Sequence, residues 1–546
     1  MSLLSRLFAT AYKLPQALTY DLIVEHDVMI PMDDGTHAYA DIWTGKTNKN
    51  VKTPVVLIRT PYRRGETAIV ARLASERGYR VVLANCRGRY GSEGKWLPFH
   101  DEQMDGEATI RWINKQSWSD GRIYTLGASY QGFCQWALTV HPDENIRSMA
   151  IIQSDSDPRS IIYPNGILGL ETVIAWLTIL EGQKSTLLML WGALFGERSH
   201  KKAYESVNLK DCDQLILGRS IDYYQQWLKN PYDSSYWDSL IPRPDDMLVP
   251  PILMVGGWYD LHVNGQIHDF SFLRAAGRHV RLIIGPWNHE SMGITGYILR
   301  EGFAWFAKYG KNETNDAEQQ DGMRIYIMGR KQWLDLKEWP IKGETQSFYL
   351  HKDAILSPLA AEEETVRKYI YDPIKPTPSI GGNVTIIGKT AGVKTQVKRE
   401  KRSDVLCYTT QKLKYPLCII GNPEVKLWVS TNAETTDFFL RICDVKPSGK
   451  SLNVVDGMSR VIFKSSDKFK DNAIAQIVIQ MNPTAYEFAA GHKIRLQVSS
   501  GAHPMYSRNF GTAASNDIKA NYKQAEIKIY HGANHLSEIR LPVFIN

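Results

Sequence analysis

Short apolar runs alternate with amphipathic stretches along the N-terminal part of the chain. Residues 23–45 alternate apolar and polar side chains around the turn Asp33-Asp34-Gly35, which predicts an antiparallel hairpin. Buried strands are predicted next at 54–59, 79–85 and 123–126, and helices at 69–77, 105–115 and 133–138. Strands and helices that alternate at this spacing indicate a mostly parallel, doubly wound sheet.

The pattern changes twice further along. Between residues 158 and 247, apolar side chains recur at helical spacing with no strand between them, in runs at 167–179, 187–195 and 221–228. Strands at 251–255 and 280–284, with a helix at 266–276 between them, then resume the first pattern. After Gly343 the chain is rich in short β runs separated by turn residues, at 347–350, 417–420, 425–429, 438–445, 474–479, 492–499 and 525–529.

These changes predict a mostly parallel α/β core with an inserted helical cap and a C-terminal all-β domain of the jelly-roll type. The predicted boundaries are 1–157 for the first part of the core, 158–247 for the cap, 248–345 for the second part of the core and 346–546 for the β-sandwich. At 546 residues the chain is too long for a single core, and a hydrophobic content of 43% with 11% aromatic residues is ample for burial.

Composition excludes several classes of function. The net charge of +7 is small for this length and includes no dense basic block, so we expect no nucleic-acid partner. No apolar stretch approaches about 18 residues, so we expect no membrane span. The six cysteines form no C-x-x-C pair and no metal-ligand spacing, which predicts isolated thiols of a reducing, cytoplasmic compartment and no metal or cofactor. The N-terminal residues 1–14 are expected to be a packing arm rather than a signal peptide.

A candidate nucleophile lies in Gly127-Ala128-Ser129-Tyr130-Gln131-Gly132, between the predicted strand at 123–126 and the helix that follows. This is G-x-S-x-G with one extra residue. A serine on a sharp strand-to-helix turn has an exposed hydroxyl above a helix N-terminus, and flanking glycines avoid collisions with neighbouring strands and helices. Taken alone, the motif is equally compatible with an ordinary glycine-rich turn.

Two later strands supply the partners that such a serine needs. The run at 251–255 ends in Gly256-Gly257-Trp258-Tyr259-Asp260, and the run at 280–284 ends in Gly285-Pro286-Trp287-Asn288-His289. The carboxyl ends of parallel strands meet at one edge of a sheet, so these side chains are expected beside the serine. The order serine, acid, histidine is that of α/β-hydrolases. The sequence therefore predicts a catalytic triad of Ser129, Asp260 and His289.

Further motifs resemble one hydrolase family. G-x-S-Y-x-G, G-G-W-Y-D, G-P-W-x-H and R-G-x-x-G-S-E-G, with F-Y-L-H and Y-D-P near the C-terminus, resemble the CocE/NonD hydrolases grouped with cocaine esterase and X-prolyl dipeptidyl peptidase. This resemblance implies a three-domain serine hydrolase, made of an α/β-hydrolase core, a helical cap and a jelly-roll domain, that cleaves esters or amides through an acyl-enzyme. It also implies an oxyanion hole made by the backbone N–H of Tyr130 and the hydroxyl of Tyr62.

The substrate pocket is less well defined by the sequence. Candidate substrate-binding residues are Gln131, Trp176, Trp191, Trp258 and His262, and each aromatic residue could equally well only pack helices together. The family branch that acts on α-amino-acid esters has a carboxylate pair where this chain has His262 and Val263, and a glutamate where it has Gln131. We therefore expect a small-molecule ester or amide substrate and a mainly apolar acyl pocket.

Alternatives to this esterase or amidase remain. They are an α-amino-acid ester hydrolase or β-lactam acylase, an X-Pro dipeptidyl-peptidase, and a non-catalytic binding protein on the same fold. The oligomeric state stays open, a homo-oligomer included.

Overall fold

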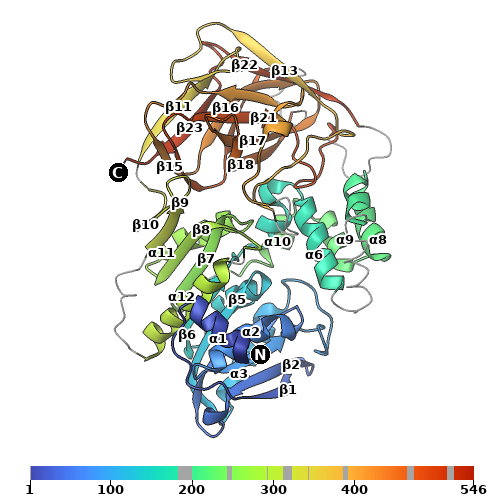
Figure 1. Cartoon of the computed structure of the whole chain (residues 1–546). Helices are drawn as coiled ribbons and strands as arrows, with labels where there is room; N and C mark the ends of the chain where they lie inside the picture. Colours follow the sequence, from blue (N-terminus) through green and yellow to red (C-terminus); the bar gives the residue numbers. More distant parts are fainter. Residues whose placement is uncertain are drawn as a thin grey trace.

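The computed structural model describes residues 2–182, 199–242, 249–291, 293–311, 322–341, 343–384, 391–463, 473–512 and 522–545. Figure 1 shows three parts: a sheet flanked by helices, a group of helices at its side, and a β domain above both. The predicted architecture of an α/β core, a helical insertion and a C-terminal β domain is confirmed.

The core is a ten-stranded sheet in the order β1-β2-β4-β3-β5-β6-β7-β8-β9-β10. The strands from β4 to β9 run parallel, whereas β1, β2 and β10 are antiparallel additions at the edges. The bounds are β1 Leu22–Pro31, β2 His37–Gly45, β3 Thr53–Thr60, β4 Arg80–Asn85, β5 Ser119–Ala128, β6 Ile146–Ile152, β7 Ile252–Tyr259, β8 Val280–Asn288, β9 Gly322–Ile327 and β10 Gln332–Leu336. The sequence pattern predicted β1 to β5, β7 and β8 but missed β6, β9 and β10.

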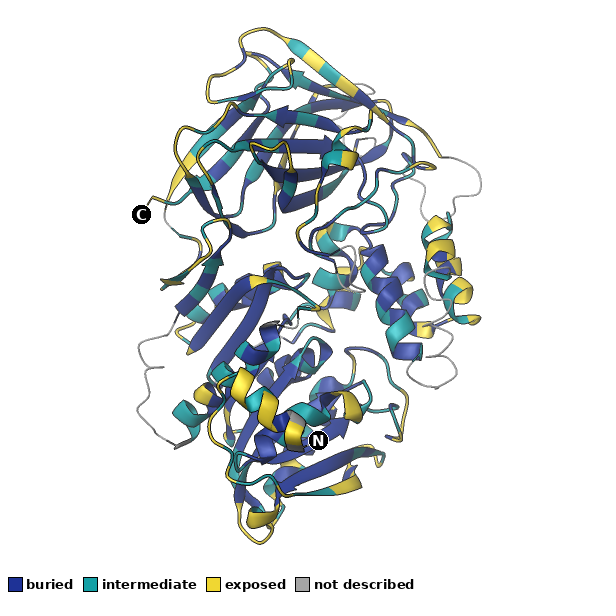
Figure 2. Cartoon of the chain, in the orientation of Figure 1, coloured by how far each residue is buried: buried dark blue, intermediate teal, exposed yellow. Residues whose placement is uncertain are grey.

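Helices cover both faces of this sheet, which explains the continuous apolar runs of its central strands. Alternate residues of β3 and β4 enter two separate apolar clusters, one on each face. One cluster includes α3 (Glu102–Asn114) and α11 (Val263–Ala275); the other includes α2 (Arg64–Ser75) and α12 (Gly293–Lys311). Helix α1 (Ser2–Ala11) packs against α2, where the Ser5 hydroxyl donates to Glu76 at 2.8 Å. The central strands are accordingly buried (Figure 2).

The helical insertion follows β6 and ends before β7. It includes α5 (Arg159–Ile162), α6 (Leu170–Gly182), α8 (Cys212–Leu217), α9 (Asp222–Lys229) and α10 (Ser234–Asp238). The helix expected at 187–195 lies outside the described residues. The apolar core of the insertion is continuous with Phe99, Tyr130 and Phe133 of the α/β core, so the cap packs directly on the helix that follows Ser129. None of the described helices has both the length and the hydropathy needed to cross a bilayer.

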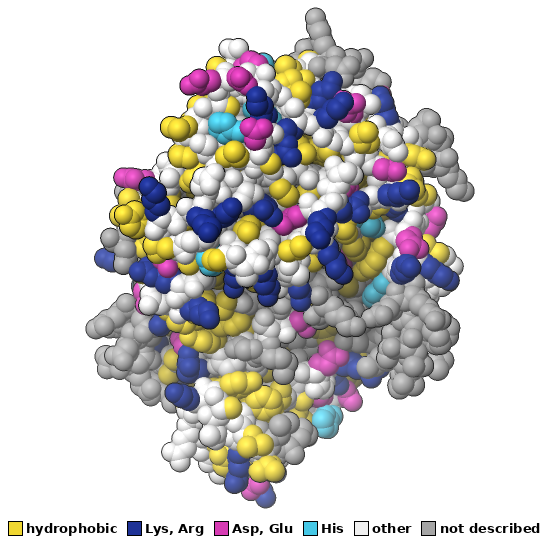
Figure 3. Space-filling model, turned by 45° about the horizontal axis from the view of Figure 1, so that its top comes forward, with side chains coloured by type: hydrophobic (Ala, Val, Ile, Leu, Met, Phe, Trp, Pro, Cys, Tyr) yellow, Lys and Arg dark blue, Asp and Glu magenta, His cyan; other side chains and the backbone are white. Residues whose placement is uncertain are grey.

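The C-terminal domain consists of a nine-stranded and a four-stranded antiparallel sheet that share one apolar core. The larger sheet contains β11 Glu344–Leu350, β12 Leu356–Ser357, β13 Thr365–Tyr371, β15 Leu417–Gly421, β16 Glu424–Thr431, β19 Ala475–Gln480, β20 Thr484–Phe488, β22 Ala525–His531 and β23 Glu538–Val543. The smaller contains β14 Leu406–Thr409, β17 Thr435–Val445, β18 Ser451–Ile462 and β21 Lys493–Ser499. On the face seen in Figure 3, Lys and Arg side chains are spread over the surface with acidic side chains between them.

All three parts meet near the carboxyl edge of the core sheet. The Asn383 amide of the β domain donates to the backbone oxygen of Asp260 at 3.0 Å. The Arg508 guanidinium of the same domain donates to backbone oxygens of the cap, including that of Ser206 at 2.6 Å. The β domain is therefore hydrogen-bonded both to the cap and to the loop that carries the candidate acid.

Candidate active site

The turn that carries the candidate nucleophile Ser129 joins β5 to helix α4 (Tyr130–Trp136). Ser129 has φ 56° and ψ −124°, a conformation that L-residues rarely adopt and that recurs at strained functional turns. A Cβ on Gly127 would lie 2.4 Å from Gln131 Cβ, and one on Gly132 would lie 2.4 Å from Ser154 Cβ. Both glycines are therefore required sterically, as the motif predicted.

The candidate base and acid lie at the ends of β8 and β7. His289 Nδ1 is 3.0 Å from Asp260 Oδ2, with the carboxylate fully buried and the imidazole 11% exposed. The backbone N–H of His262 donates to the other carboxylate oxygen at 2.9 Å. The Gln153 amide donates to Asp260 Oδ2 and, at 3.0 Å, to the backbone oxygen of Asn288. Three donors thus fix the carboxylate in one orientation.

Sequence analysis missed Gln153. It directly follows β6, a strand that was also missed, and it has φ 45°. A polar residue at the carboxyl end of a core strand is the pattern that could have identified it.

The acid and the imidazole shift each other's pKa values in opposite directions. Burial alone would raise the pKa of Asp260, but the charge and hydrogen bond of His289 outweigh it and hold that pKa below the usual range. Burial alone would lower the pKa of His289, but Asp260 outweighs it and raises that pKa. The carboxylate therefore stays ionised near neutral pH, and the imidazole is a stronger base than in water.

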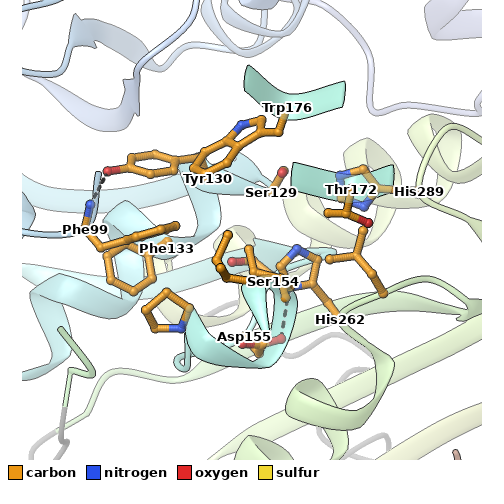
Figure 4. Close-up of a pocket in the computed structure, with 14 residues that line it drawn as sticks. Phe99, Ser129, Tyr130, Phe133, Ser154, Asp155, Thr172, Trp176, His262 and His289 are labelled. Carbon is orange, nitrogen blue, oxygen red and sulfur yellow. Dashed lines mark hydrogen bonds and ion pairs between the residues drawn. The ribbon is translucent and has the colours of Figure 1, made fainter. Parts of the chain in front are cut away.

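Ser129 and His289 line one pocket, and both point into it in Figure 4. The Tyr62 hydroxyl is hydrogen-bonded to Ser129 and accepts the indole N–H of Trp176 at 3.0 Å. Burial raises the pKa of Tyr62 to about 12 against these two hydrogen bonds, so the hydroxyl keeps its proton at neutral pH and can donate it.

The hydroxyl of Tyr130 bonds to other residues of the core, so the backbone N–H of Tyr130 is its candidate donor beside Ser129. Its hydroxyl donates to Glu102 Oε1 at 2.8 Å and accepts the backbone N–H of Phe99 at 2.7 Å. Its own N–H is the first of helix α4, a position that has no acceptor within the helix. This N–H and the Tyr62 hydroxyl both lie beside Ser129.

The pocket walls are mainly apolar, and the cavity volume is about 40 Å³. Its apolar lining consists of Phe99, Tyr130, Phe133, Pro158, Ile161, Ile162, Trp176 and Leu261. Trp176 packs against Trp227, and the two rings are parallel with their centroids 5.9 Å apart. A cavity of this size fits a short acyl group.

The other expected substrate-binding residues have different environments. His262 lines the pocket and bonds through Nδ1 to Asp155 Oδ2 at 2.9 Å. Gln131 does not line it, since its amide bonds to Thr60 and Thr67. Trp258 is buried in the core, where its indole donates to the backbone oxygen of Tyr326 at 2.8 Å. Trp191 lies outside the described residues.

Two groups of side chains in the described ranges have the spacing of metal ligands. One is Asp260, His262 and His289, in which both imidazole Nδ1 atoms already bond to carboxylates. The other is Cys86, Glu102 and Cys134, in which the carboxylate pairs with Arg59 at 2.8 Å and burial raises the pKa values of both thiols. Protein partners thus account for both groups.

Comparison with known proteins adds family relationships to this geometry. The X-Pro dipeptidyl-peptidase (S15 family) profile matches residues 34–291, and the X-Pro dipeptidyl-peptidase C-terminal non-catalytic domain matches residues 315–540. The cocaine esterase of Rhodococcus sp. (strain MB1 Bresler) is 28% identical, over 95% of this chain and 98% of its own.

Solved structures share the fold. An aminopeptidase from a marine sediment Thaumarchaeota archaeon and an α-amino acid ester hydrolase each have a TM-score of 0.81 and 22% identity, over 97% of this chain and 98% of theirs. A CocE/NonD family hydrolase from Staphylococcus aureus has a TM-score of 0.72 and 17% identity, over 96% of this chain and 94% of its own.

Proposed function

Since the chain belongs to the S15/CocE family of hydrolases, we propose that it cleaves an ester or amide bond by nucleophilic catalysis at Ser129, with His289 as base and Asp260 as orienting acid. Membership of the family confirms the resemblance inferred from the sequence motifs. The observation that carries the proposal is the buried His289–Asp260 contact of 3.0 Å beside a serine on a strained turn, in one pocket.

The proposed chemistry has two steps. In the first, Ser129 Oγ bonds to the carbonyl carbon while its proton passes to His289 Nε2, and that proton then goes to the departing alcohol or amine as its bond to carbon breaks. In the second, water attacks the acyl carbonyl carbon while one of its protons passes to His289, and that proton then goes to Ser129 Oγ as the Oγ–acyl bond breaks and the acid leaves. Asp260 stays ionised throughout and stabilises the imidazolium.

Negative charge forms on the carbonyl oxygen in both steps. We assign its stabilisation to the Tyr62 hydroxyl and the Tyr130 backbone N–H. Trp176 donates to the Tyr62 oxygen, so the phenolic hydrogen is free to point elsewhere. Donors that are oriented before the reaction typically contribute several kcal/mol to an oxyanion.

The pocket favours an acyl group without a charged amine. Asp155 is the acidic residue among the described lining residues, and its oxygens already accept from His262, from the Ser160 hydroxyl and from the Asp157 N–H. Among the described lining residues, this leaves no free carboxylate for a substrate ammonium group. We therefore favour an esterase or amidase for neutral, short acyl groups over the amino-acid ester hydrolase and dipeptidyl-peptidase alternatives.

Active-site labelling tests the proposal. A fluorophosphonate probe should modify the folded protein at Ser129, as located by peptide mass spectrometry, and Ser129→Ala should abolish both labelling and hydrolysis of short-chain nitrophenyl esters. Ser239→Ala, which removes an exposed serine of the cap, is the matched control. A folded chain that takes up no probe, or whose esterase activity survives Ser129→Ala, would overturn the proposal in favour of a binding protein or another nucleophile.

A further inference from the structure

One corner of the otherwise apolar pocket is polar. His262 and Ser154 both line it (Figure 4), and His262 bonds to Asp155, the residue that follows Ser154. Both follow core strands, Ser154 after β6 and His262 after β7, and both are buried. The proposed triad uses neither side chain. Since burying polar groups in an apolar pocket is costly unless they are hydrogen-bonded, this corner requires an explanation.

His262 is held by a second carboxylate. Its Nδ1 is 2.9 Å from Asp155 Oδ2, and the side chains are 7% and 1% exposed. The glycine at 265 lets helix α11 approach Asp155, because a Cβ there would lie 2.3 Å from the carboxylate carbon. The ring is therefore fixed, with Nδ1 facing Asp155.

The other nitrogen of His262 faces the pocket. In Figure 4 the ring turns one nitrogen toward Asp155 and the other away from it, into the space below Ser129. In the tautomer that donates from Nδ1 to this carboxylate, Nε2 is a hydrogen-bond acceptor. In the described part of the chain no group bonds to it.

Ser154 supplies the complementary group. Ser154 is 1% exposed, and its Oγ is buried without a hydrogen-bond partner among the described residues. It packs against Gly132 of the nucleophile helix, where a Cβ would lie 2.8 Å from Oγ. A buried hydroxyl that lacks a protein partner and lines a pocket can donate to a ligand.

We propose that this corner binds a hydroxyl group on the acyl part of the substrate, so that the preferred substrates are esters or amides of short hydroxy acids. A hydroxyl can donate to His262 Nε2 and accept from Ser154 Oγ, and so satisfies both groups. This inference rests on the proposed function, because it takes the pocket beside Ser129 as the acyl site.

Charged groups fit the corner less well. An ammonium would need a carboxylate, and both oxygens of Asp155 already accept hydrogen bonds from the protein. A carboxylate would need a cation, and the described lining contains no lysine or arginine. An unsubstituted acyl chain would leave the two polar groups buried and unpaired. A site with such groups therefore discriminates against substrates that lack the hydroxyl.

The test compares matched methyl esters followed in a pH-stat: butanoate, 2-hydroxybutanoate, 3-hydroxybutanoate and 2-aminobutanoate. We expect kcat/KM for one hydroxy ester to exceed that for butanoate by about 10- to 100-fold, the factor that two ordinary hydrogen bonds contribute. Ser154→Ala and His262→Asn should each reduce about tenfold the ratio of kcat/KM for the preferred hydroxy ester to kcat/KM for butanoate. His268→Asn, which alters an exposed imidazole on the same helix, should leave the preference unchanged.

Fluorophosphonate labelling of Ser129 in the same samples separates the possible failures. Labelling with equal rates for butanoate and both hydroxy esters, or with the amino ester as the best substrate, overturns this inference and leaves the proposed function standing. Absence of both labelling and hydrolysis overturns the proposed function and, with it, this inference. Since the wild-type comparison needs no variant, the test holds even if a substituted chain fails to fold.

Discussion

The hydrogen bond from Trp176 to Tyr62 allows a quantitative test of the proposed oxyanion hole. Tyr62→Phe removes one of its two donors and should lower kcat by about 10²- to 10³-fold, or about 2.7–4 kcal/mol. KM should change little, because the donor acts on charge that develops only in the transition state.

Trp176→Phe should have a smaller effect that depends on Tyr62. The indole N–H donates to the Tyr62 oxygen at 3.0 Å, and a neutral hydrogen bond of this kind contributes about 1 kcal/mol net. Losing it should lower kcat about fivefold by releasing the phenol from its productive orientation. In a Tyr62→Phe background there is no hydroxyl to orient, so the same substitution should cost nothing further in kcat.

The assay is a double-mutant cycle on kcat with a short-chain nitrophenyl ester, in which KM is allowed to change because Trp176 also lines the pocket. Trp237→Phe is the matched control, since it removes another buried cap indole whose N–H donates to a backbone oxygen, that of Asn230, at 2.8 Å. If Tyr62→Phe retains a third or more of wild-type kcat, Tyr62 is not an oxyanion donor. If Trp176→Phe lowers kcat by the same factor in both backgrounds, Trp176 does not act through Tyr62.

Three other predictions follow from buried contacts. In the proposed mechanism, His289 accepts the Ser129 proton only when the imidazole is neutral. Asp260 raises the pKa of His289, so kcat/KM should fall as the pH drops below a pKa higher than that of an ordinary histidine. In Asp260→Asn the pH–rate profile should shift to lower pH and kcat should drop about 10³- to 10⁴-fold; an unmoved profile would show that this carboxylate does not tune the base. Gln153→Leu removes a donor to the Asp260 carboxylate and should lower kcat about tenfold with KM retained, as measured in the same ester assay; unchanged kcat would leave Gln153 a purely structural role. In the β domain, Asp456→Asn breaks a fully buried ion pair with Arg441, whose two contacts are 2.5 and 2.7 Å. The substitution should reduce the free energy of unfolding, measured by chemical denaturation, by about 3–5 kcal/mol. A loss of less than about 1 kcal/mol would contradict this prediction.

Local sequence patterns were sufficient for the candidate catalytic residues. The glycines around Ser129 are required by contacts with residues close in sequence or one strand away, and the motif indicates them directly. Asp260 and His289 follow apolar runs long enough to identify as buried strands, and parallel strands necessarily bring their carboxyl ends to one edge. Strand periodicity and chain order together therefore predicted the α/β core, apart from β6, β9 and β10, and the sheet edge at which these residues meet.

The pocket depended on contacts that no local pattern encodes. Trp176 and Trp258 are equivalent as aromatic residues in the sequence, yet one lines the pocket and the other is buried in the core. The pairing of His262 with Asp155 joins residues 107 positions apart. Gln131, next to the nucleophile turn, bonds away from the pocket instead.

This difference between the candidate catalytic residues and the pocket has a physical reason. Backbone hydrogen bonding and the alternation of buried side chains repeat along the chain, so the sequence alone determined the strand-end serine, acid and histidine. The direction in which a side chain points into a cavity depends on packing among several elements at once. Only the tertiary structure therefore decided which polar groups face the substrate.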